Sequence, residues 1–277
     1  MQKSILITGC SSGIGLYAAT ALQQRGYRVF ATARHASDVA ALQAQGLESL
    51  LLDVNNTHSM QQAFTEILHR TGGTLFALFN NAGYLQSGAI EDLSRDVMRA
   101  QFETNVFGAM ELTNMVIPIM RKQGYGRIIQ NTSILGVMTI PYCGVYSAAK
   151  FALEGFSNTL RQELYSSPIK VCIMAPGPIM SKLREHAYQH YQQSLKQQTK
   201  TSAHAEKYRQ LENNYFNSGK SQSFMASPEI LLTKLIHALE SPHPKAHYFV
   251  GLPAQLFAFL RRILPDSMLD WVVRKAW

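Results

Sequence analysis

The sequence predicts a doubly wound α/β domain, in which helices cover both faces of a parallel sheet. Short runs rich in β-branched residues alternate with longer amphipathic runs, which is the pattern of consecutive β–α–β units. The first short run leads directly into a glycine-rich segment, TGCSSGIG at 8–15. The chain has 277 residues, 46% of them apolar, which is enough for one sizeable core. No linker or internal repeat divides it, so we expect a single domain.

The short apolar runs are the expected strands, beginning with SILIT at 4–8 and RVFATA at 28–33. The later ones are 48–54, 75–83, 126–133, 169–177 and a short candidate at 247–251. Helical spacing of apolar residues predicts helices at 13–27 (with a stop at Gly26), 37–45, 58–72, 96–120 (ending near Pro118) and 146–165. Right-handed crossovers then place ligands beyond the carboxyl ends of the strands.

We expect residues 1–251 to form the main domain, with a polar, glutamine-rich stretch at 181–226 and a helical tail at 252–277. The net charge of +8 comes from scattered basic residues. No dense basic stripe interleaved with aromatics precedes the C-terminus, so we expect no nucleic-acid partner. Three cysteines without a CxxC motif suit a reducing compartment. The absence of a signal peptide or a long apolar run makes the cytoplasm the expected location.

The glycine-rich segment lies where the first strand turns into the first helix. Gly9 permits the sharp turn, and Gly13 and Gly15 let a ligand and the sheet approach the helix start. Unpaired amides and the positive helix dipole attract a phosphate there, and Ser11 and Ser12 add hydroxyl donors. The segment therefore favours a pyrophosphate site, although the GxxxGxG spacing also suits a tight turn of small residues.

Arg34 ends the second strand, where dinucleotide folds often carry an acid for the ribose 2′-hydroxyl. An arginine grips a 2′-phosphate that an acid would repel. The preceding Ala33 confirms that the acid is absent from this position, so the segment favours NADP over NAD. The alternative is an ordinary solvated arginine.

The segment YSAAK places Tyr146 and Lys150 four residues apart, on one face of a helix. A nearby ammonium is expected to lower the pKa of the tyrosine, which suits proton transfer to a carbonyl oxygen during hydride transfer. Ser133, at the carboxyl end of the fifth strand, is placed to stabilise the same oxygen. Asn105 lies within a long helix, where asparagine is a mediocre helix former. By itself the YxxxK spacing also fits an ordinary helix contact.

Together these segments resemble the short-chain dehydrogenase/reductase family over nearly the whole chain. The matching pieces are TGCSSGIG, DV at 53–54, NNAG at 80–83, NVFG from Asn105, Ser133, YSAAK and PGPI at 176–179. Their order and spacing are those of the family, whose members have a Rossmann fold. Within it, the chain is most similar to bacterial NADP-dependent aldehyde reductases and to retinol and 17β-hydroxysteroid dehydrogenases.

The resemblance implies a role for each matched residue. Tyr146 would be the general acid in reduction, Lys150 would bind the nicotinamide ribose, Ser133 would polarise the carbonyl, and Asn105 would hold a water in a proton relay. Asp53 would bind the adenine amino group, and Asn81 would line the cofactor cleft. The full cofactor set is Gly9, Ser11, Ser12, Gly13, Ile14, Gly15, Arg34, Asp53, Val54, Asn81, Ala82, Gly83, Tyr146, Lys150, Pro176, Gly177, Ile179 and Ser181.

The resemblance also implies that the stretch at 181–226 forms a lid over the substrate, whose chemical class is less sharply indicated. Val137, Met138 and Tyr142 lie between the serine and the tyrosine, and their apolar character favours an apolar carbonyl. His186 and His190 share a helix face, but no third ligand is evident, so we expect no metal. The tail carries apolar residues at helical spacing beside Arg261, Arg262, Arg274 and Lys275. It suits either a helix packed on the domain or a helix lying on an anionic membrane surface.

The sequence thus predicts NADPH-dependent reduction of an apolar aldehyde or ketone to the alcohol. The alternatives are NAD(P)-linked oxidation of a lipophilic alcohol and a catalytically silent, NADP-sensing binding protein. The resemblance also implies a homo-oligomer, formed through the helices that follow the fourth and fifth strands.

Overall fold

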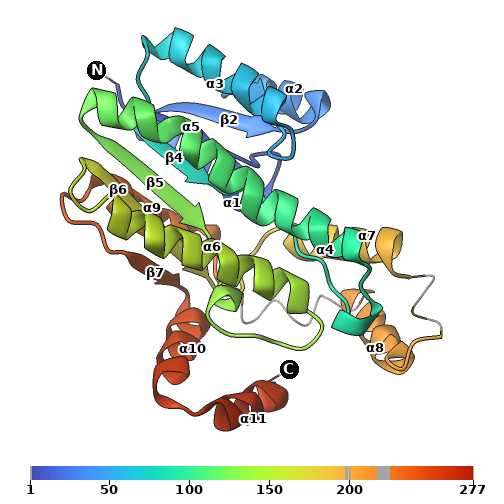
Figure 1. The fold of residues 1–277 in the computed structure, drawn as a ribbon. Coiled ribbons are helices and arrows are strands. Elements are labelled where there is room, and N and C mark those ends of the chain that lie inside the picture. The colour runs from blue at the N-terminus through green and yellow to red at the C-terminus, as the bar shows by residue number, and fades with distance from the viewer. Residues whose placement is uncertain (1, 197–198, 200, 217–224, 277) are drawn as a thin grey trace.

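The computed structural model describes residues 2–276, apart from 197, 198, 200 and 217–224. Part of the predicted lid therefore lies outside the described residues, as does the last residue of the predicted tail. A single seven-stranded sheet forms the centre, and all its neighbouring strands are parallel. This confirms the predicted doubly wound α/β fold, drawn in Figure 1.

The strand order is β3-β2-β1-β4-β5-β6-β7. The strands are β1 (Ser4–Ile7), β2 (Arg28–Ala33), β3 (Glu48–Leu51), β4 (Ala77–Asn80), β5 (Gly126–Asn131), β6 (Ile169–Pro176) and β7 (His247–Val250). The order reverses between β1 and β4, so the loops that follow these two strands face each other across the crevice where doubly wound folds bind ligands. The glycine-rich segment follows β1 and the NNAG segment follows β4.

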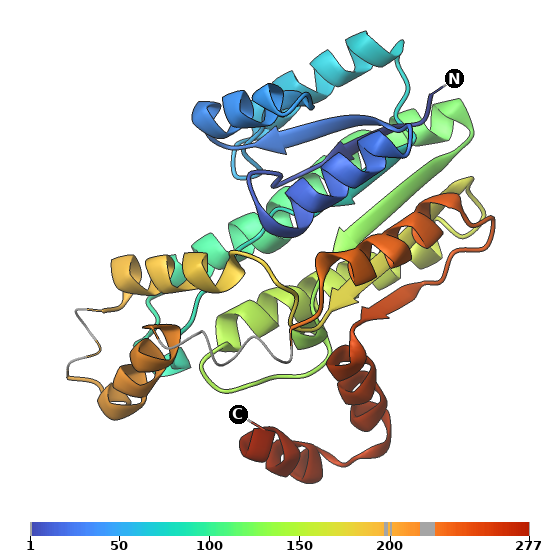
Figure 2. The same cartoon turned by 180° about the vertical axis from the view of Figure 1, so that it is seen from behind.

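Two helical layers enclose the sheet. One layer contains α3 (Thr57–Thr71), α5 (Gly108–Gln123) and α6 (Gly144–Glu163), and lies in front of the sheet in Figure 1. The other contains α1 (Gly13–Gln24), α2 (Ala36–Ala44) and α9 (Pro228–Glu240), and is seen from behind in Figure 2. Each layer buries its own apolar cluster against one face of the sheet. Burial on both faces explains why the strands read as continuous apolar runs.

The predicted helix at 96–120 is wrong in its end point and in its regularity. It begins as α4 (Arg95–Phe102), continues through a π-helical segment, η2 (Glu103–Phe107), and ends as α5 at Gln123, with Pro118 inside it. Packing overrides the proline penalty, because Val116 and Met120 on either side of Pro118 are fully buried against the sheet. The side chain of Gln123 then exchanges hydrogen bonds of 2.8 and 3.0 Å with the backbone of Leu75. Gly124, with φ of 81°, then ends the helix.

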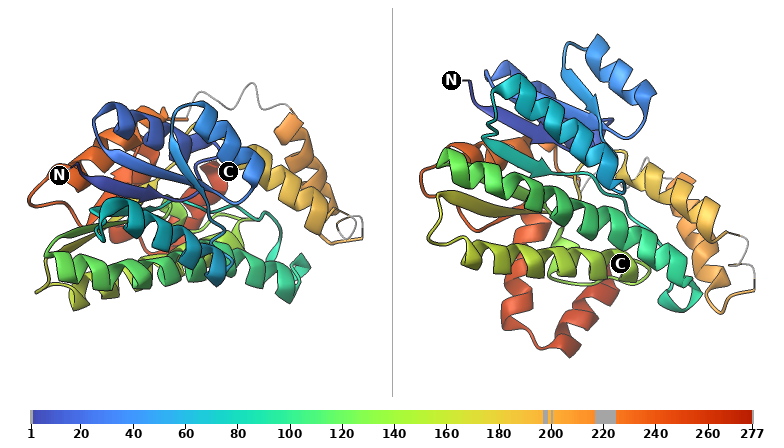
Figure 3. Two further views of the ribbon diagram at one scale, coloured as in Figure 1. Left: turned by 90° about the horizontal axis from the view of Figure 1, so that it is seen from above. Right: turned by 45° about the horizontal axis from the view of Figure 1, so that its top comes forward.

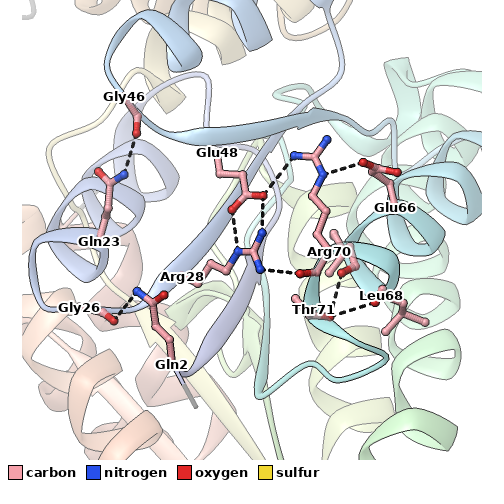
Figure 4. Close-up of polar contacts among 11 residues, drawn as sticks. Gln2, Gln23, Gly26, Arg28, Gly46, Glu48, Glu66, Leu68, Arg70 and Thr71 are labelled. Carbon is pink, nitrogen blue, oxygen red and sulfur yellow. Dashed lines mark hydrogen bonds and ion pairs between the residues drawn. The ribbon is translucent and has the colours of Figure 1, made fainter.

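The predicted third and fourth strands are too long, because β3 ends at Leu51 and β4 spans only Ala77–Asn80. Beside β3, the open edge of the sheet is tied by an ion-pair network. Glu48 accepts hydrogen bonds from Arg28 of β2 and from Arg70 of α3, and Arg70 also pairs with Glu66, as Figure 4 shows.

Two helical appendages extend from the carboxyl side of the sheet (Figure 3). The described part of the lid contains α7 (Leu183–Ser194) and α8 (Ala205–Phe216). The chain enters and leaves the lid at neighbouring positions, because Ile179, just before the lid, forms an isolated β-bridge with Ala226 at its end. The tail forms two helices, α10 (Leu252–Ile263) and α11 (Asp266–Ala276). Within the described ranges, no helix is long and apolar enough to cross a membrane.

Candidate active site

The glycine-rich segment at 8–15 forms a loop, the glycine loop, which turns sharply out of β1 and lies directly against the loop after β4. Gly9 has a φ of 70°, and a Cβ atom there would come within 2.8 Å of the Cα atom of Ala82. A Cβ atom on Gly15 would lie 2.2 Å from the carbonyl oxygen of Gly9. Both contacts are shorter than side-chain carbon atoms tolerate, so these two glycines are required by the backbone path.

The first turn of α1 faces the same crevice. Ser12 is the N-cap residue of α1, but its side chain makes no capping hydrogen bond, and no acidic residue lies in the first turn. The first amides of a helix have no partner within the helix, and the dipole favours an anion there. Ser11 is exposed, and Ser12, Gly13 and Ile14 are partly exposed. The predicted phosphate-binding groups are therefore accessible at one helix end.

Asn81 joins the two loops. Its side-chain amide donates to the carbonyl oxygens of Thr8 and Gly9, at 2.9 and 3.1 Å, and its Oδ1 atom accepts a 2.9 Å hydrogen bond from Asn131 at the end of β5. The hydroxyl of Thr8 accepts from the backbone amides of Asn81 and Ala82. Asn81 is thus a structural brace of the predicted cofactor cleft and also lies in its wall.

The start of the lid closes against the glycine loop. A Cβ atom on Gly13 would be 3.2 Å from the Cβ atom of Ser181, so the predicted cofactor residue Ser181 lies at the predicted phosphate site. The PGPI segment leads there from β6. Pro176 ends β6, Gly177 donates a 2.9 Å backbone hydrogen bond to Val250, and Ile179 is buried.

Tyr146 and Ser133 are brought together as predicted. Tyr146 lies in the first turn of α6, and Ser133 caps the short 3₁₀ helix η3 (Ile134–Gly136), where its hydroxyl accepts from the amide of Leu135 at 3.1 Å. Burial raises the pKa of Tyr146 to about 12, although the nearby hydroxyl of Ser133 lowers it.

Lys150 is also buried, one turn further along α6. Its ammonium donates a 2.8 Å hydrogen bond to the carbonyl oxygen of Asn131 and lies 5.7 Å from the ring centroid of Tyr146. Burial lowers the pKa of Lys150 to about 8. The sequence predicts that this ammonium lowers the pKa of Tyr146. The net pKa of Tyr146 is nevertheless raised, because burial of the phenol is the larger effect.

Asn105 lies in the π-helical segment η2 and is 1% exposed. Its side chain accepts from the backbone amide of Tyr84 at 3.0 Å and donates to the carbonyl oxygen of Tyr84 at 2.9 Å. A Cβ atom on Gly83 would be 3.0 Å from Asn105 Oδ1 and 3.8 Å from Lys150 Nζ, so the glycine lets both side chains converge. Such π-helical segments are frequent at functional sites. The proton-relay role of Asn105 stays a prediction.

The adenosine end of the predicted cleft is marked by Arg34, which follows β2 and is exposed. Its Nε atom donates to His35 at 3.1 Å. Asp53 follows β3 and accepts from the amide of Asn55 at 3.0 Å, and Val54 is buried against Gly108. Since β2 and β3 lie on one side of β1, these residues share one end of the crevice.

The predicted substrate residues are divided between two places. Met138 is buried in the apolar cluster of Tyr146, and Val137 packs against it. Tyr142 has an unusual φ of 62° and its hydroxyl lies 3.1 Å from His204 of the lid.

The tail also contributes to the apolar cluster of Tyr146, a contact that the sequence does not predict. The tail residues in this cluster are Ala254, Ala258, Leu269 and Val273. An apolar helix face is compatible with many packing partners, so the sequence held no signal for this one.

His190 of α7 packs against the loop after β4. The ring of His190 stacks on Tyr84, with centroids 4.2 Å apart, and burial lowers its pKa. Among the residues that the structure describes, no three histidine, cysteine or acidic side chains gather as metal ligands would.

The glycine loop lies where the strand order reverses between β1 and β4, and Tyr146, Lys150 and Ser133 form a buried group, the Tyr–Lys–Ser group. Together they define an oxidoreductase of the dinucleotide-binding class. Residues 3–192 match the family model described as short chain dehydrogenase. The chain therefore belongs to the short-chain dehydrogenase/reductase family, whose members act on CH–OH and carbonyl groups.

Two curated relatives are similar over almost the whole chain. One is "Uncharacterized oxidoreductase YbbO" from Escherichia coli (strain K12), which is 36% identical over 99% of this chain and 95% of its own length. Another is "17-beta-hydroxysteroid dehydrogenase type 6" from Bos taurus, which is 32% identical over 100% of this chain and 89% of its own length.

Solved structures agree on the fold. A short-chain dehydrogenase from Streptomyces avermitilis has a TM-score of 0.75 and 27% identity, covering 99% of this chain and 94% of its own. A short-chain dehydrogenase from Burkholderia cenocepacia, solved in complex with NADP, has a TM-score of 0.73 and 21% identity, covering 97% of this chain and 96% of its own.

Replacement of Asn81 tests the brace between the two loops. Asn81→Ala removes the donor to the carbonyl oxygens of Thr8 and Gly9, so we expect a loss of roughly 1–3 kcal/mol in unfolding free energy and about tenfold weaker dinucleotide binding. Asn56→Ala removes the N-cap of α3 and provides the control, with about 1 kcal/mol lost and binding unchanged. Urea unfolding and fluorescence titration measure both. Equal dinucleotide binding by the two variants would contradict the bracing role of Asn81.

Proposed function

We propose that the protein reduces an apolar aldehyde or ketone to the alcohol, with NADPH as hydride donor. The observation that carries this proposal is the convergence of Tyr146, Ser133 and Lys150 in one buried group beside the glycine loop. When bound, the nicotinamide supplies hydride to the carbonyl carbon. The protein then has to supply a proton to the carbonyl oxygen and to stabilise its developing charge.

Tyr146 is suited to give that proton. With a pKa of about 12, the phenol is protonated at neutral pH and acts as the general acid. The hydroxyl of Ser133 lies near the phenol and would donate to the same substrate oxygen. The ammonium of Lys150 stabilises the phenolate that remains after transfer. The same groups in reverse would oxidise a lipophilic alcohol, which is the alternative direction that the steroid-dehydrogenase relative favours.

The preference for NADP(H) rests on Arg34. The guanidinium is exposed, and its Nε atom donates a hydrogen bond to the imidazole of His35, which leaves its terminal nitrogens free of that contact. A bidentate contact to a 2′-phosphate is therefore available to it. The complex of the Burkholderia cenocepacia relative with NADP is compatible with this choice.

The proposed substrate is apolar because the surroundings of Tyr146 are apolar. Met138, Leu85 and Ile140 lie in or against its cluster, and the tail helices complete it. A sugar or a charged acid would leave its polar groups without partners here.

Arg34→Ala tests the cofactor preference. Loss of a charge-assisted contact costs roughly 1.5–3 kcal/mol, so we expect about 10- to 100-fold weaker NADPH binding and little change for NADH. Arg99→Ala, at an exposed arginine on α4, should change neither. If Arg34→Ala weakens both cofactors equally, the basis for NADP is removed.

Tyr146→Phe tests the chemistry. NADPH oxidation is followed against aliphatic and aromatic aldehydes, retinal and ketosteroids, and we expect roughly 10²–10⁴-fold lower turnover with NADPH binding retained. Tyr165→Phe, at a tyrosine 87% exposed beyond α6, is the control with normal turnover. Substantial activity of Tyr146→Phe contradicts the general-acid role, and a silent wild-type protein that still binds NADPH favours the sensing alternative.

We further propose that the protein is cytoplasmic and touches the inner membrane surface through its tail. All three cysteines are buried free thiols, as in a reducing compartment. One face of α10 packs on the domain, but its other face exposes large apolar side chains, namely Leu252, Leu256, Phe259 and Ile263. Basic residues occupy the last turns of α10 and α11, and this combination suits an anionic lipid surface.

Vesicle flotation tests the membrane contact. We expect co-flotation with anionic vesicles and less of it with neutral ones. Phe259→Glu in the exposed face should reduce recovery about tenfold, because a charge in the interface opposes apolar burial. Ile230→Glu, on the exposed side of α9, should float as the wild type does. A wild-type protein that stays entirely in solution would contradict the proposed membrane contact.

A homo-oligomer is also proposed, through the outer face of α5 and α6. Exposed aromatic side chains lie there and on the adjoining η2, including Phe107, Phe151 and Phe156, and solvent-exposed apolar patches of this kind often mark interfaces. Light scattering should give a multiple of the 31.0 kDa monomer mass and a shift toward the monomer for Phe156→Arg. A monomeric wild type would contradict the interface.

A further inference from the structure

A buried carboxylate lies one turn beyond Lys150 and is not used by the chemistry described above. Glu154 belongs to the same face of α6 as Tyr146 and Lys150, and its side chain is 7% exposed. A carboxylate is seldom buried unless it is paired. The partners of the Glu154 carboxylate therefore indicate its role.

Two side chains from different strands hold the carboxylate. Its Oε1 atom accepts a 2.7 Å hydrogen bond from the hydroxyl of Thr132, and its Oε2 atom lies 2.5 Å from Nε2 of His247. Thr132 follows β5, between Asn131, which binds Lys150, and Ser133. His247 begins β7, where it pairs with Ile173 of β6. The carboxylate is thus held from α6, β5 and β7 at once.

The backbone also leaves room for it. A Cβ atom on Gly136 would lie 2.9 Å from Cγ of Glu154 and 3.1 Å from the carbonyl oxygen of Lys150. The absence of a side chain at Gly136 therefore lets η3 approach α6 between the lysine and the glutamate. Any larger residue would push the carboxylate away from its partners.

Glu154 faces a cavity distinct from the cofactor crevice. This cavity of about 430 Å³ is lined by Glu154, His247 and Phe249, with Arg261 and Arg262 of α10 on its wall. Its lining does not include Tyr146, Ser133 or Lys150. The ionisable groups around Glu154 are His247, which contacts it, the two arginines of α10, which line the same cavity, and Lys150, one turn earlier on the same helix.

The electrostatic effect on Lys150 follows from this arrangement. Burial lowers the pKa of Lys150, because an ammonium loses its hydration, and the charge of Glu154 opposes that effect. At a separation of four residues on one helix, the two side chains are neighbours. Without the carboxylate, a larger fraction of Lys150 would be neutral at physiological pH.

We propose that Glu154, held by Thr132 and His247, is a positioning residue that keeps Lys150 charged and so sets the upper pH limit for NADPH binding and carbonyl reduction. The inference rests on the proposed role of Lys150 in binding the cofactor and stabilising the phenolate. It assigns to β7, a strand far from the catalytic residues in the sequence, a part in the chemistry.

Glu154→Gln is the variant that tests this, since it keeps the shape and removes the charge. The pH dependence of kcat/KM and of the NADPH dissociation constant is measured between pH 6 and 10. The wild type should lose both above about pH 8. In Glu154→Gln the limit should move at least one unit lower, giving about tenfold less activity and binding at pH 8 but nearly normal values at pH 6. Glu163→Gln, at the exposed end of α6, should not move it.

Two further variants separate positioning from a purely structural role. Glu154→Asp retains the charge, so its upper pH limit should lie closer to that of the wild type than the limit of Glu154→Gln does. His247→Gln loosens the carboxylate and should lower the limit by a smaller step, and it provides the readout if Glu154→Gln does not fold. A uniform loss at all pH values, with the limit unmoved in both variants, would overturn the proposal. Because NADPH binding is measured by itself, a failure to reduce any carbonyl would contradict the proposed function without deciding this one.

Discussion

The burial of one ammonium group constrains the rest of the site. Lys150 is only 5% exposed, and a buried charge is costly unless polar groups surround it. The carbonyl oxygen of Asn131 accepts from it, the side chain of Asn131 reaches Asn81, and Asn81 holds the carbonyl oxygens of the glycine loop. One chain of hydrogen bonds therefore links α6, which carries Tyr146 and Lys150, to the predicted phosphate site.

The sheet makes this chain possible. The switch in strand order between β1 and β4 brings the two loops face to face, and the glycines at their contact allow the backbones to touch. The π-helical segment holds Asn105 inward, where it fixes the backbone of Tyr84 directly after the NNAG segment. Each of these features serves a rigid crevice, which is what orientation of a hydride donor and acceptor requires.

The parts that surround the substrate side are built differently. The lid helices contact the core through aromatic side chains such as Tyr142, Tyr191 and Tyr208, whereas the tail closes the apolar cluster of Tyr146. Both are appended after the sheet strands that carry the cofactor residues.

The sequence by itself determined the α/β class, the strand–helix order and the local motifs, because strand and helix periodicity and the need for glycine at a tight turn are local properties. Tyr146 and Lys150 were predictable for the same reason, since four residues along one helix fix their proximity. The tertiary structure alone decided the continuation of a helix through Pro118, the direction of the pKa shift of Tyr146, and the contact between Glu154 and His247. These depend on burial and on partners distant in sequence, which no local pattern encodes.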